Sequence, residues 1–150
     1  MRTIVKENIA DLIRLEIEAI KNIPVNDSFE AAVDIIKKRV HDAALNGKVV
    51  MSGMGKCGQI ALNIATTLSS TGTPAVYLHP SEAQHGDLGI LCKNDVLILL
   101  SNSGKTREII ELITLSKILH PDVFVISITG KIDSPLATES DIVLHTGDSE

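Results

Sequence analysis

Two segments at the start of the chain repeat apolar residues at the spacing of an α-helix. In the first segment, apolar residues recur three or four positions apart from Ile9 to Ile20. In the second they recur from Phe29 to Val40, after a predicted cap at Asp27 or Ser28. Pro24 separates the two segments. The pattern therefore predicts two amphipathic N-terminal helices within residues 1–46.

From Lys48 onward the pattern changes to short β-branched runs separated by helix-length segments. These runs are apolar throughout, as expected of strands that are covered on both faces. The candidate strands are Val49–Ser52, Ala75–Leu78, Val96–Leu100, Val123–Ile128 and Ile142–Leu144. The helices predicted between them are Gln59–Ser70, Arg107–Leu119 and a short turn of helix after Ser134-Pro135.

This alternation predicts an α/β fold: a three-layer α-β-α sandwich around a five-stranded parallel sheet, preceded by the two helices. A length of 150 residues with 44% hydrophobic residues fits one domain over residues 1–150, with the α/β core in residues 47–150. The end Asp148-Ser149-Glu150 follows the last strand without a closing helix. We therefore expect the core to be truncated at its C-terminus.

Composition narrows the classes of partner. A net charge of −5 gives no attraction to nucleic acid or to an anionic membrane, and an aromatic content of 2% disfavours stacking on bases. No apolar run approaches the roughly 20 residues that span a bilayer. Acidic residues interrupt the apolar pattern near the N-terminus, which therefore does not resemble a signal peptide. We expect a cytoplasmic protein with no nucleic-acid or membrane partner, in which Cys57 and Cys92 are reduced thiols.

A glycine-rich loop follows the first predicted strand. Residues 53–58 contain G-x-G-x-x-G, which alone would suggest a dinucleotide site. A dinucleotide site also requires an acidic residue at the end of the second strand. That strand ends in Leu78-His79-Pro80, and Glu82 comes only after the proline. Close packing of strand and helix explains the glycines equally well. It does not explain Lys56, a cation next to Gly55 where the helix opens.

A hydroxyl-rich loop follows the third predicted strand. Its residues are Ser101, Asn102, Ser103, Gly104, Lys105 and Thr106. Hydroxyls and backbone amides at a helix N-terminus form an oxyanion site without a net positive charge on the protein, and a phosphate monoester is the natural ligand. The alternative is that Ser103 or Thr106 is only an N-cap. An N-cap needs only one hydroxyl, whereas this loop has three, so the pattern favours a phosphate site over a simple cap.

Other candidates stand nearby in the sequence. His79 and His85 lie in the polar stretch after the second strand, where they could contact a ligand, although Gly86-Asp87 could simply form a turn. Glu108 is either a carboxylate favoured by the helix dipole or a proton-transfer group beside a bound phosphate. The remaining histidines have no such context and are interpreted as surface or packing residues: His41, His120 and His145.

Taken together, these loops resemble a known family. The similarity covers Gly47–Leu144 and is to the SIS (sugar isomerase) domain, of flavodoxin-like fold, of arabinose-5-phosphate isomerases. The segments that carry it are Gly53-Met54-Gly55-Lys56 with Gly58, Ser70-Thr71-Gly72-Thr73-Pro74, His79-Pro80 with Glu82-Ala83, His85-Gly86-Asp87-Leu88-Gly89 and Ser101-Asn102-Ser103-Gly104.

The resemblance implies interconversion of D-ribulose 5-phosphate and D-arabinose 5-phosphate, which feeds 3-deoxy-D-manno-octulosonate into lipopolysaccharide. It also implies a homotetramer with no required cofactor. Carried over residue by residue, it implies that Lys56 and Glu108 are catalytic, with His85 as an alternative base, and that His79 can take up an inhibitory zinc. The residues implied to hold the phosphate are Ser101, Ser103 and Thr106, and those implied to line the sugar are Gly72, Thr73, His79 and His85.

The sequence departs from the family at several points. Cys57 stands where the family usually has Ser, and Lys105 with Arg107 replaces a more acidic phosphate loop. Glu150 is a candidate for the family's further acidic residue, while its further histidine and its CBS pair have no counterpart. An alternative function is therefore a non-catalytic sensor of a phosphosugar or nucleotide sugar. A dinucleotide enzyme using the Gly53 loop is a third reading.

Overall fold

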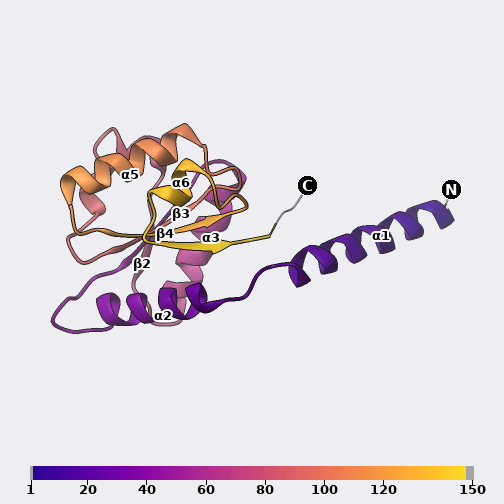
Figure 1. Ribbon diagram of the computed structural model, residues 1–150, viewed down its shortest axis with the longest axis horizontal. Helices are drawn as coiled ribbons and strands as arrows, with labels where there is room; N and C mark the ends of the chain where they lie inside the picture. The colour runs from indigo at the N-terminus through magenta and orange to yellow at the C-terminus, as the bar shows by residue number, and fades with distance from the viewer. Residues whose placement is uncertain (1, 148–150) are drawn as a thin grey trace.

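Two helices open the chain, as the apolar pattern predicts. A computed structural model describes residues 2–147, with α1 at Arg2–Lys21 and α2 at Asp27–Val40. Figure 1 shows α1 projecting away from the body while α2 lies along it. The predicted cap of α2 is wrong by one residue, because the side chain of Asn26 accepts the hydrogen bond from the Ser28 amide at 3.0 Å. No helix within the described residues is long and apolar enough to cross a membrane.

The predicted five-stranded parallel sheet is confirmed. Its strands are β1 (Val49–Gly53), β2 (Ala75–Tyr77), β3 (Val96–Leu100), β4 (Phe124–Thr129) and β5 (Ile142–His145). They lie in the order β2-β1-β3-β4-β5, and all neighbours are parallel. The connecting helices include α3 (Lys56–Ser70), α5 (Arg107–Leu119) and α6 (Pro135–Thr138). Each predicted strand is therefore present, with its ends displaced by no more than one residue.

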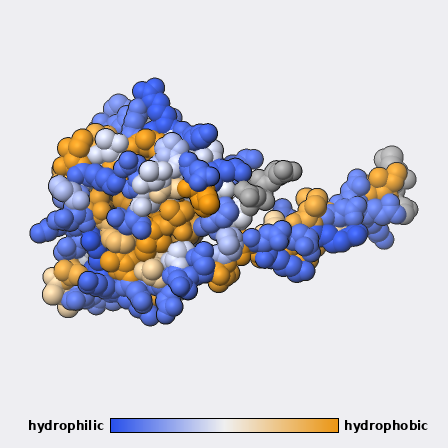
Figure 2. Space-filling view, viewed as in Figure 1, coloured by the Kyte–Doolittle hydropathy of each residue, from blue (hydrophilic) through white to orange (hydrophobic). Residues whose placement is uncertain are grey.

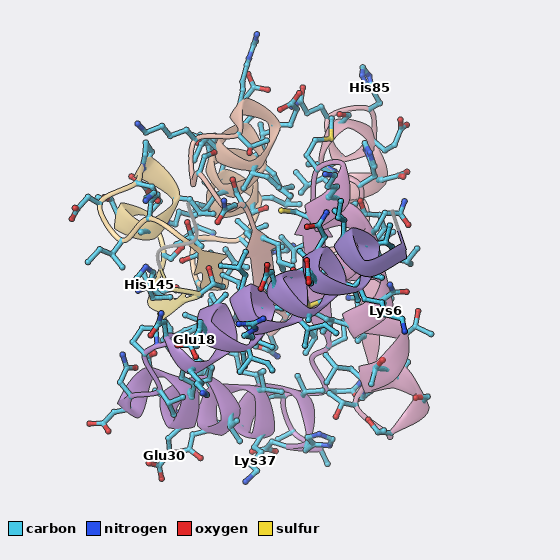
Figure 3. All side chains as sticks on the ribbon, turned by 90° about the vertical axis from the view of Figure 1, so that its right-hand side faces the viewer. Lys6, Glu18, Glu30, Lys37, His85 and His145 are labelled. Atoms are coloured by element: carbon cyan, nitrogen blue, oxygen red, sulfur yellow. The ribbon has the colours of Figure 1, made fainter. Side chains whose placement is uncertain are left out.

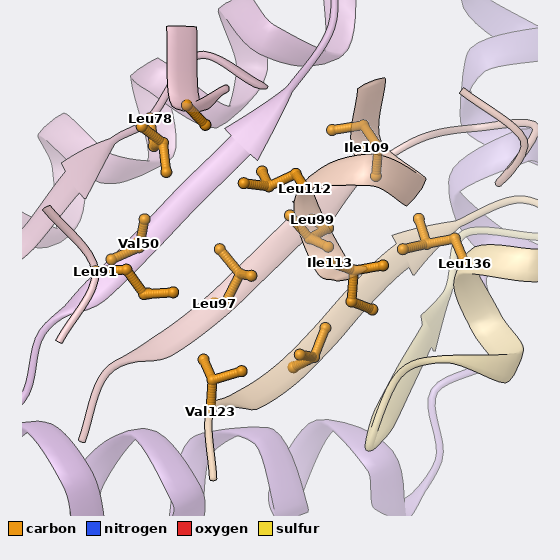
Figure 4. Close-up of a cluster of buried hydrophobic side chains, with 12 residues drawn as sticks. Val50, Leu78, Leu91, Leu97, Leu99, Ile109, Leu112, Ile113, Val123 and Leu136 are labelled. Carbon is orange, nitrogen blue, oxygen red and sulfur yellow. The ribbon is translucent and has the colours of Figure 1, made fainter. Parts of the chain in front are cut away.

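Both faces of the sheet are covered, which explains the uninterrupted apolar runs. Successive strand residues point to opposite faces, so Val49 and Met51 pack toward α2 and α3 while Val50 packs toward α5. Figure 4 shows the hydrophobic cluster on the α5 side of the sheet, in which Leu97 and Leu99 of β3 pack against Ile109 and other residues of α5. The result is the predicted three-layer sandwich.

The polar stretch after β2 is more ordered than the sequence suggests. It forms the short helix α4 (Pro80–Ala83) and the 3-10 helix η1 (Asp87–Ile90). Pro80 at the first helical position supplies a φ suited to helix initiation. An element of four residues is too short to give a hydrophobic periodicity, so the pattern could not reveal it.

The strand order determines where loops can meet. Parallel pairing brings the carboxyl ends of all strands to one edge of the sheet. Gly53 of β1, Leu100 of β3 and Ile128 of β4 are register partners at that edge. The loops after β1, β3 and β4 therefore leave neighbouring strands side by side. The strand order reverses between β1 and β3, which is where ligands bind in folds of this kind.

Candidate functional site

The hydroxyl-rich loop after β3 folds into a closed turn. Ser101 is buried, and its Oγ lies 2.8 Å from Thr106 Oγ1 and accepts a hydrogen bond from the Gly104 amide at 3.1 Å. Ser103 and Asn102 are exposed at the tip of the turn. We call residues Ser101–Thr106 the cradle. The contact between the buried Ser101 and the half-buried Thr106 holds the shape of the cradle and leaves its tip open to solvent.

The cradle leads into α5 without a side-chain cap. Thr106 occupies the N-cap position, but its side chain makes no capping hydrogen bond. The Ser103 hydroxyl accepts from the Lys105 amide at 3.3 Å. Neither hydroxyl therefore serves as the N-cap that the alternative reading required. The first amides of α5 have no acceptor within the helix, and the helix dipole makes that end attractive to an anion.

The loop after β4 supports the cradle from behind. Gly104 has a φ of +62°, and a Cβ there would overlap the side chain of Ser134, which is 1% exposed. The Leu136 amide donates to the Gly104 carbonyl at 3.1 Å, and the Gly130 amide donates to the Asn102 carbonyl at 3.1 Å. Only glycine fits at position 104, and the turn is held by contacts with a distant part of the sequence.

A cavity of about 410 Å³ opens beside the cradle. Its lining residues are Lys105, Gly130, Lys131, Ile132, Asp133, Ser134 and His145. His145 Nε2 lies 3.2 Å from the Gly130 carbonyl oxygen. His145, interpreted from the sequence as a surface or packing residue, lines this cavity. Its position as the last residue of β5, at the carboxyl edge, was the signal that could have found it.

The glycine-rich loop after β1 is shaped by packing. A Cβ at Gly53 would lie 2.7 Å from the Cys57 carbonyl carbon, and one at Gly58 would lie 2.6 Å from the Gly53 oxygen. Tyr77 Oη donates to the Gly53 carbonyl at 3.0 Å, and burial raises the pKa of Tyr77, which keeps this donor protonated. Close approach of strand and helix therefore accounts for these two glycines without a dinucleotide.

The rest of the dinucleotide pattern is missing. β2 ends at Tyr77, and Glu82 is an exposed residue of α4 rather than the end of a strand. Gly55, with a φ of +58° and open space around its α-carbon, instead positions Lys56 as the first residue of α3. The loop presents an exposed cation at the same edge as the cradle.

Lys56 and Glu108 each lie in the first turn of a helix that follows a strand, and the two strands are neighbours in the sheet. Lys56 begins α3 after β1, and Glu108 is in the first turn of α5 after β3. Because β1 and β3 are adjacent and parallel, both side chains start from the carboxyl edge. The structure thus brings Lys56, Glu108 and the cradle to one edge of the sheet, with Glu108 half-buried and Lys56 exposed.

His79 lies at this edge but does not complete a metal site. It precedes α4, packs edge-on against Tyr77 with ring centroids 6.3 Å apart, and its Nδ1 is buried without a hydrogen-bond partner among the described residues. That nitrogen could bind a ligand atom or a metal ion. Within residues 2–147, however, no three His, Cys, Asp or Glu side chains lie close enough to hold an ion. His79 alone does not fit a zinc site.

Two of the expected sugar-site residues lie at the edge of the sheet opposite to the cradle. Gly72 and Thr73 precede β2, because α3 runs back and delivers the chain to the amino edge of the sheet. There Thr73 Oγ1 lies 3.2 Å from His41 Nε2. His85 follows α4 and is exposed, and Figure 3 shows its side chain pointing out from the body. The structure therefore does not bring Gly72 and Thr73 together with the cradle within one chain.

Arg107 is also directed away from the cradle. Its Nε donates to Glu111 at 2.7 Å, and Gln84 of the loop after α4 donates to the other oxygen of Glu111 at 2.7 Å. Both contacts lower the pKa of Glu111, with Arg107 the larger cause. Arg107 therefore helps to link the loop that contains His85 to α5, through Glu111, and does not face the cradle.

Comparison with known proteins decides the family. Residues 45–150 match the model of the SIS domain. The chain belongs to the SIS domain family. Over 140 residues it is 42% identical to arabinose 5-phosphate isomerase KdsD of Francisella tularensis, an alignment that covers 92% of this chain and 41% of that protein.

Two solved structures are similar to this SIS domain in both sequence and fold. A Bacteroides fragilis protein thought to be a phosphosugar isomerase involved in capsule formation is 58% identical, with a TM-score of 0.92 over 95% of this chain and 73% of that chain. The Escherichia coli CFT073 protein c3406, solved in complex with arabinose 5-phosphate, is 36% identical, with a TM-score of 0.84 over 99% of this chain and 76% of that chain. Both support the fold and the family.

This SIS domain spans less than half the length of the arabinose 5-phosphate isomerases of Francisella tularensis and Pseudomonas aeruginosa that it matches. Glu150, the candidate for the family's further acidic residue, lies outside the described residues.

Proposed function

We propose that this SIS domain binds a sugar phosphate and interconverts D-ribulose 5-phosphate and D-arabinose 5-phosphate. The cradle is the observation that carries the proposal, because its hydroxyls and the uncapped start of α5 offer donors to a phosphoryl group. The similarity to KdsD, and to the protein solved with arabinose 5-phosphate, supports the choice of pentose phosphate.

The reaction moves hydrogen within one molecule. A base removes a proton from C1 of the ketose, the electrons form an enediolate, and a proton is delivered to C2. The C2 carbonyl oxygen becomes a hydroxyl as the C1 hydroxyl oxygen becomes the aldehyde. Oxidation at one carbon balances reduction at the next, so this chemistry needs no external oxidant, and we propose that the domain requires no cofactor.

We assign the proton transfer to Glu108 and stabilisation of the enediolate to Lys56. Glu108 lies one helical turn or less from the cradle, which would hold the phosphate end of the substrate. Lys56 starts from the neighbouring strand and supplies a positive charge at the same edge. In this proposal the cradle fixes the distance between the phosphate and the reacting carbons.

We further propose that the domain works as a cytoplasmic homotetramer whose product enters lipopolysaccharide synthesis. Gly72 and Thr73 can then line the sugar only if a neighbouring subunit supplies them, because a single chain does not bring them to its own cradle. An inhibitory zinc at His79 would likewise need ligands from outside the described residues.

A second candidate function is binding of a phosphosugar or nucleotide sugar without turnover. The cradle supports it equally, because binding a phosphoryl group needs only the hydroxyls of the cradle and the first amides of α5. A sensor would use the cradle and dispense with Glu108.

Mixing the protein with ribulose 5-phosphate in deuterium oxide separates the two candidates. NMR would follow the appearance of arabinose 5-phosphate and the entry of deuterium at C2, while calorimetry would measure binding. Turnover in the wild type that is lost in Glu108→Gln supports the isomerase. Binding without turnover supports the sensor, and the absence of both contradicts the cradle itself.

A further inference from the structure

Helix α1 exposes a broad apolar surface. Eight of its large apolar side chains are each at least 44% exposed: Ile4, Val5, Ile9, Leu12, Ile13, Leu15, Ile17 and Ile20. Figure 1 shows the helix extending away from the body, and Figure 2 shows hydrophobic residues along it and a further hydrophobic area on the body. Removing apolar side chains from water is favourable, so this surface favours a partner that covers it.

The connection to α2 keeps α1 off its own body. It runs over residues 22–26, and Ile23 is half-buried. An added Cβ at Gly147 would lie 3.2 Å from the Asn22 carbonyl oxygen, so the connection rests against the chain after β5. A helix of 20 residues is about 30 Å long, and in this orientation most of it extends beyond the domain.

One line along α1 combines apolar residues with two charges. The residues of this line are three and four positions apart, which is the spacing at which two helices pair. We call the line the seam; it consists of Lys6, Ile9, Ile13, Glu16 and Ile20. The helix's ion pairs among the described residues are Arg14 with Asp11 and Lys21 with Glu18, on other faces. Lys6 and Glu16 are therefore left without an ion-pair partner within the described chain.

The seam is complementary to itself in one orientation. When two copies of α1 lie antiparallel with Ile9 against Ile13 of the partner subunit, Lys6 meets Glu16 of the partner subunit. The twofold symmetry repeats every one of these contacts. A parallel pair in register would instead oppose Lys6 to Lys6 and Glu16 to Glu16, which is unfavourable. The positions of the two charges thus specify an antiparallel pair.

We propose that α1 is an assembly helix that pairs antiparallel with α1 of a second copy of this chain, with Ile9 and Ile13 at the centre and Lys6–Glu16 ion pairs on either side. At about 100° per residue, all of the eight apolar side chains except Ile4 and Leu15 lie on the same side of the helix as Ile9 and Ile13, so a second copy lying on that side would cover them. A membrane surface fits less well, because the opposite face carries Glu7, Asp11 and Glu18 rather than a basic stripe.

Sedimentation velocity of the whole chain, over a range of concentrations, tests the proposal through charge exchange. Lys6→Glu or Glu16→Lys alone opposes like charges at both ends of the seam and should weaken self-association at least about tenfold. The double variant Lys6→Glu/Glu16→Lys re-creates both pairs in the antiparallel register and should return to the wild-type mass. Glu7→Lys, the same change of charge on the opposite face, is the matched control and should assemble like the wild type.

A second pair of variants tests the apolar centre. Ile9→Glu/Ile13→Glu should reduce the mass at least twofold, while circular dichroism and thermal unfolding show an intact body. A wild type that is monomeric at all concentrations would overturn the proposal. So would full assembly of the Ile9→Glu/Ile13→Glu variant, or a double charge exchange that fails to restore association. Because the readout is mass, none of these results depends on isomerase activity.

Discussion

Ser103→Ala removes a hydroxyl that the cradle presents to solvent. Ser103 is exposed, and its hydroxyl accepts only one long hydrogen bond among the described residues, from the Lys105 amide at 3.3 Å. Its loss should change the free energy of unfolding by less than about 0.5 kcal/mol. A hydrogen bond to a charged phosphate is worth about 1.5–3 kcal/mol, so affinity for arabinose 5-phosphate should fall roughly 10- to 150-fold.

Titration calorimetry measures this change directly. Ser140→Ala is the matched control, because Ser140 is a half-buried serine that precedes β5 at the opposite edge of the sheet and donates to the Leu136 carbonyl at 2.7 Å. It should bind like the wild type. Arabinose without phosphate should bind Ser103→Ala and the wild type equally. Unchanged affinity for arabinose 5-phosphate in Ser103→Ala, or an equal loss in Ser140→Ala, would refute the assignment of the phosphate to the cradle.

Three further predictions concern the frame of the site and its chemistry. Gly104→Ala should lower the free energy of unfolding by about 3 kcal/mol or more, since an unfavourable positive φ adds to overlap with buried Ser134. Gly55→Ala, with a similar φ but open space, should lose only about 1–2 kcal/mol, and equal losses in urea unfolding would argue against the contact. Glu108→Gln should reduce turnover at least about 100-fold with affinity nearly unchanged, and undiminished turnover would reduce Glu108 to a helix-start residue. Tyr77 is the chain's one tyrosine, so absorbance titration reports it alone; its midpoint should lie above the usual value of about 10, and stability should fall as the pH rises past that value because only the unfolded chain ionises readily. A midpoint at or below the usual value would contradict the burial of this hydroxyl.

The sheet could be predicted because its strands are buried on both faces. Val96–Leu100 is apolar at every position and forms a strand with the expected bounds. Signals that depend on one or two residues were less reliable: the cap of α2 is Asn26 rather than Asp27 or Ser28. The amphipathic pattern of α1 predicted a helix correctly, but periodicity cannot say that its apolar side is left uncovered by its own domain.

The site divides in a similar way. The cradle could be predicted because its hydroxyls are adjacent in sequence and follow a buried strand. The fit of Gly104 against Ser134 could not, since it joins residues thirty positions apart. Resemblance to the family placed Gly72, Thr73 and His85 in the sugar site without saying which chain supplies them. The direction of α3 carries Gly72 and Thr73 to the far edge, a consequence of topology rather than of composition.

A crystal structure of this protein with arabinose 5-phosphate tests the central claim most directly. We predict phosphate density within hydrogen-bond distance of the Ser103 hydroxyl and the first amides of α5, with the sugar extending toward Lys56. An empty cradle beside a sugar phosphate bound elsewhere, or a phosphate held by the Gly53 loop alone, would contradict the account.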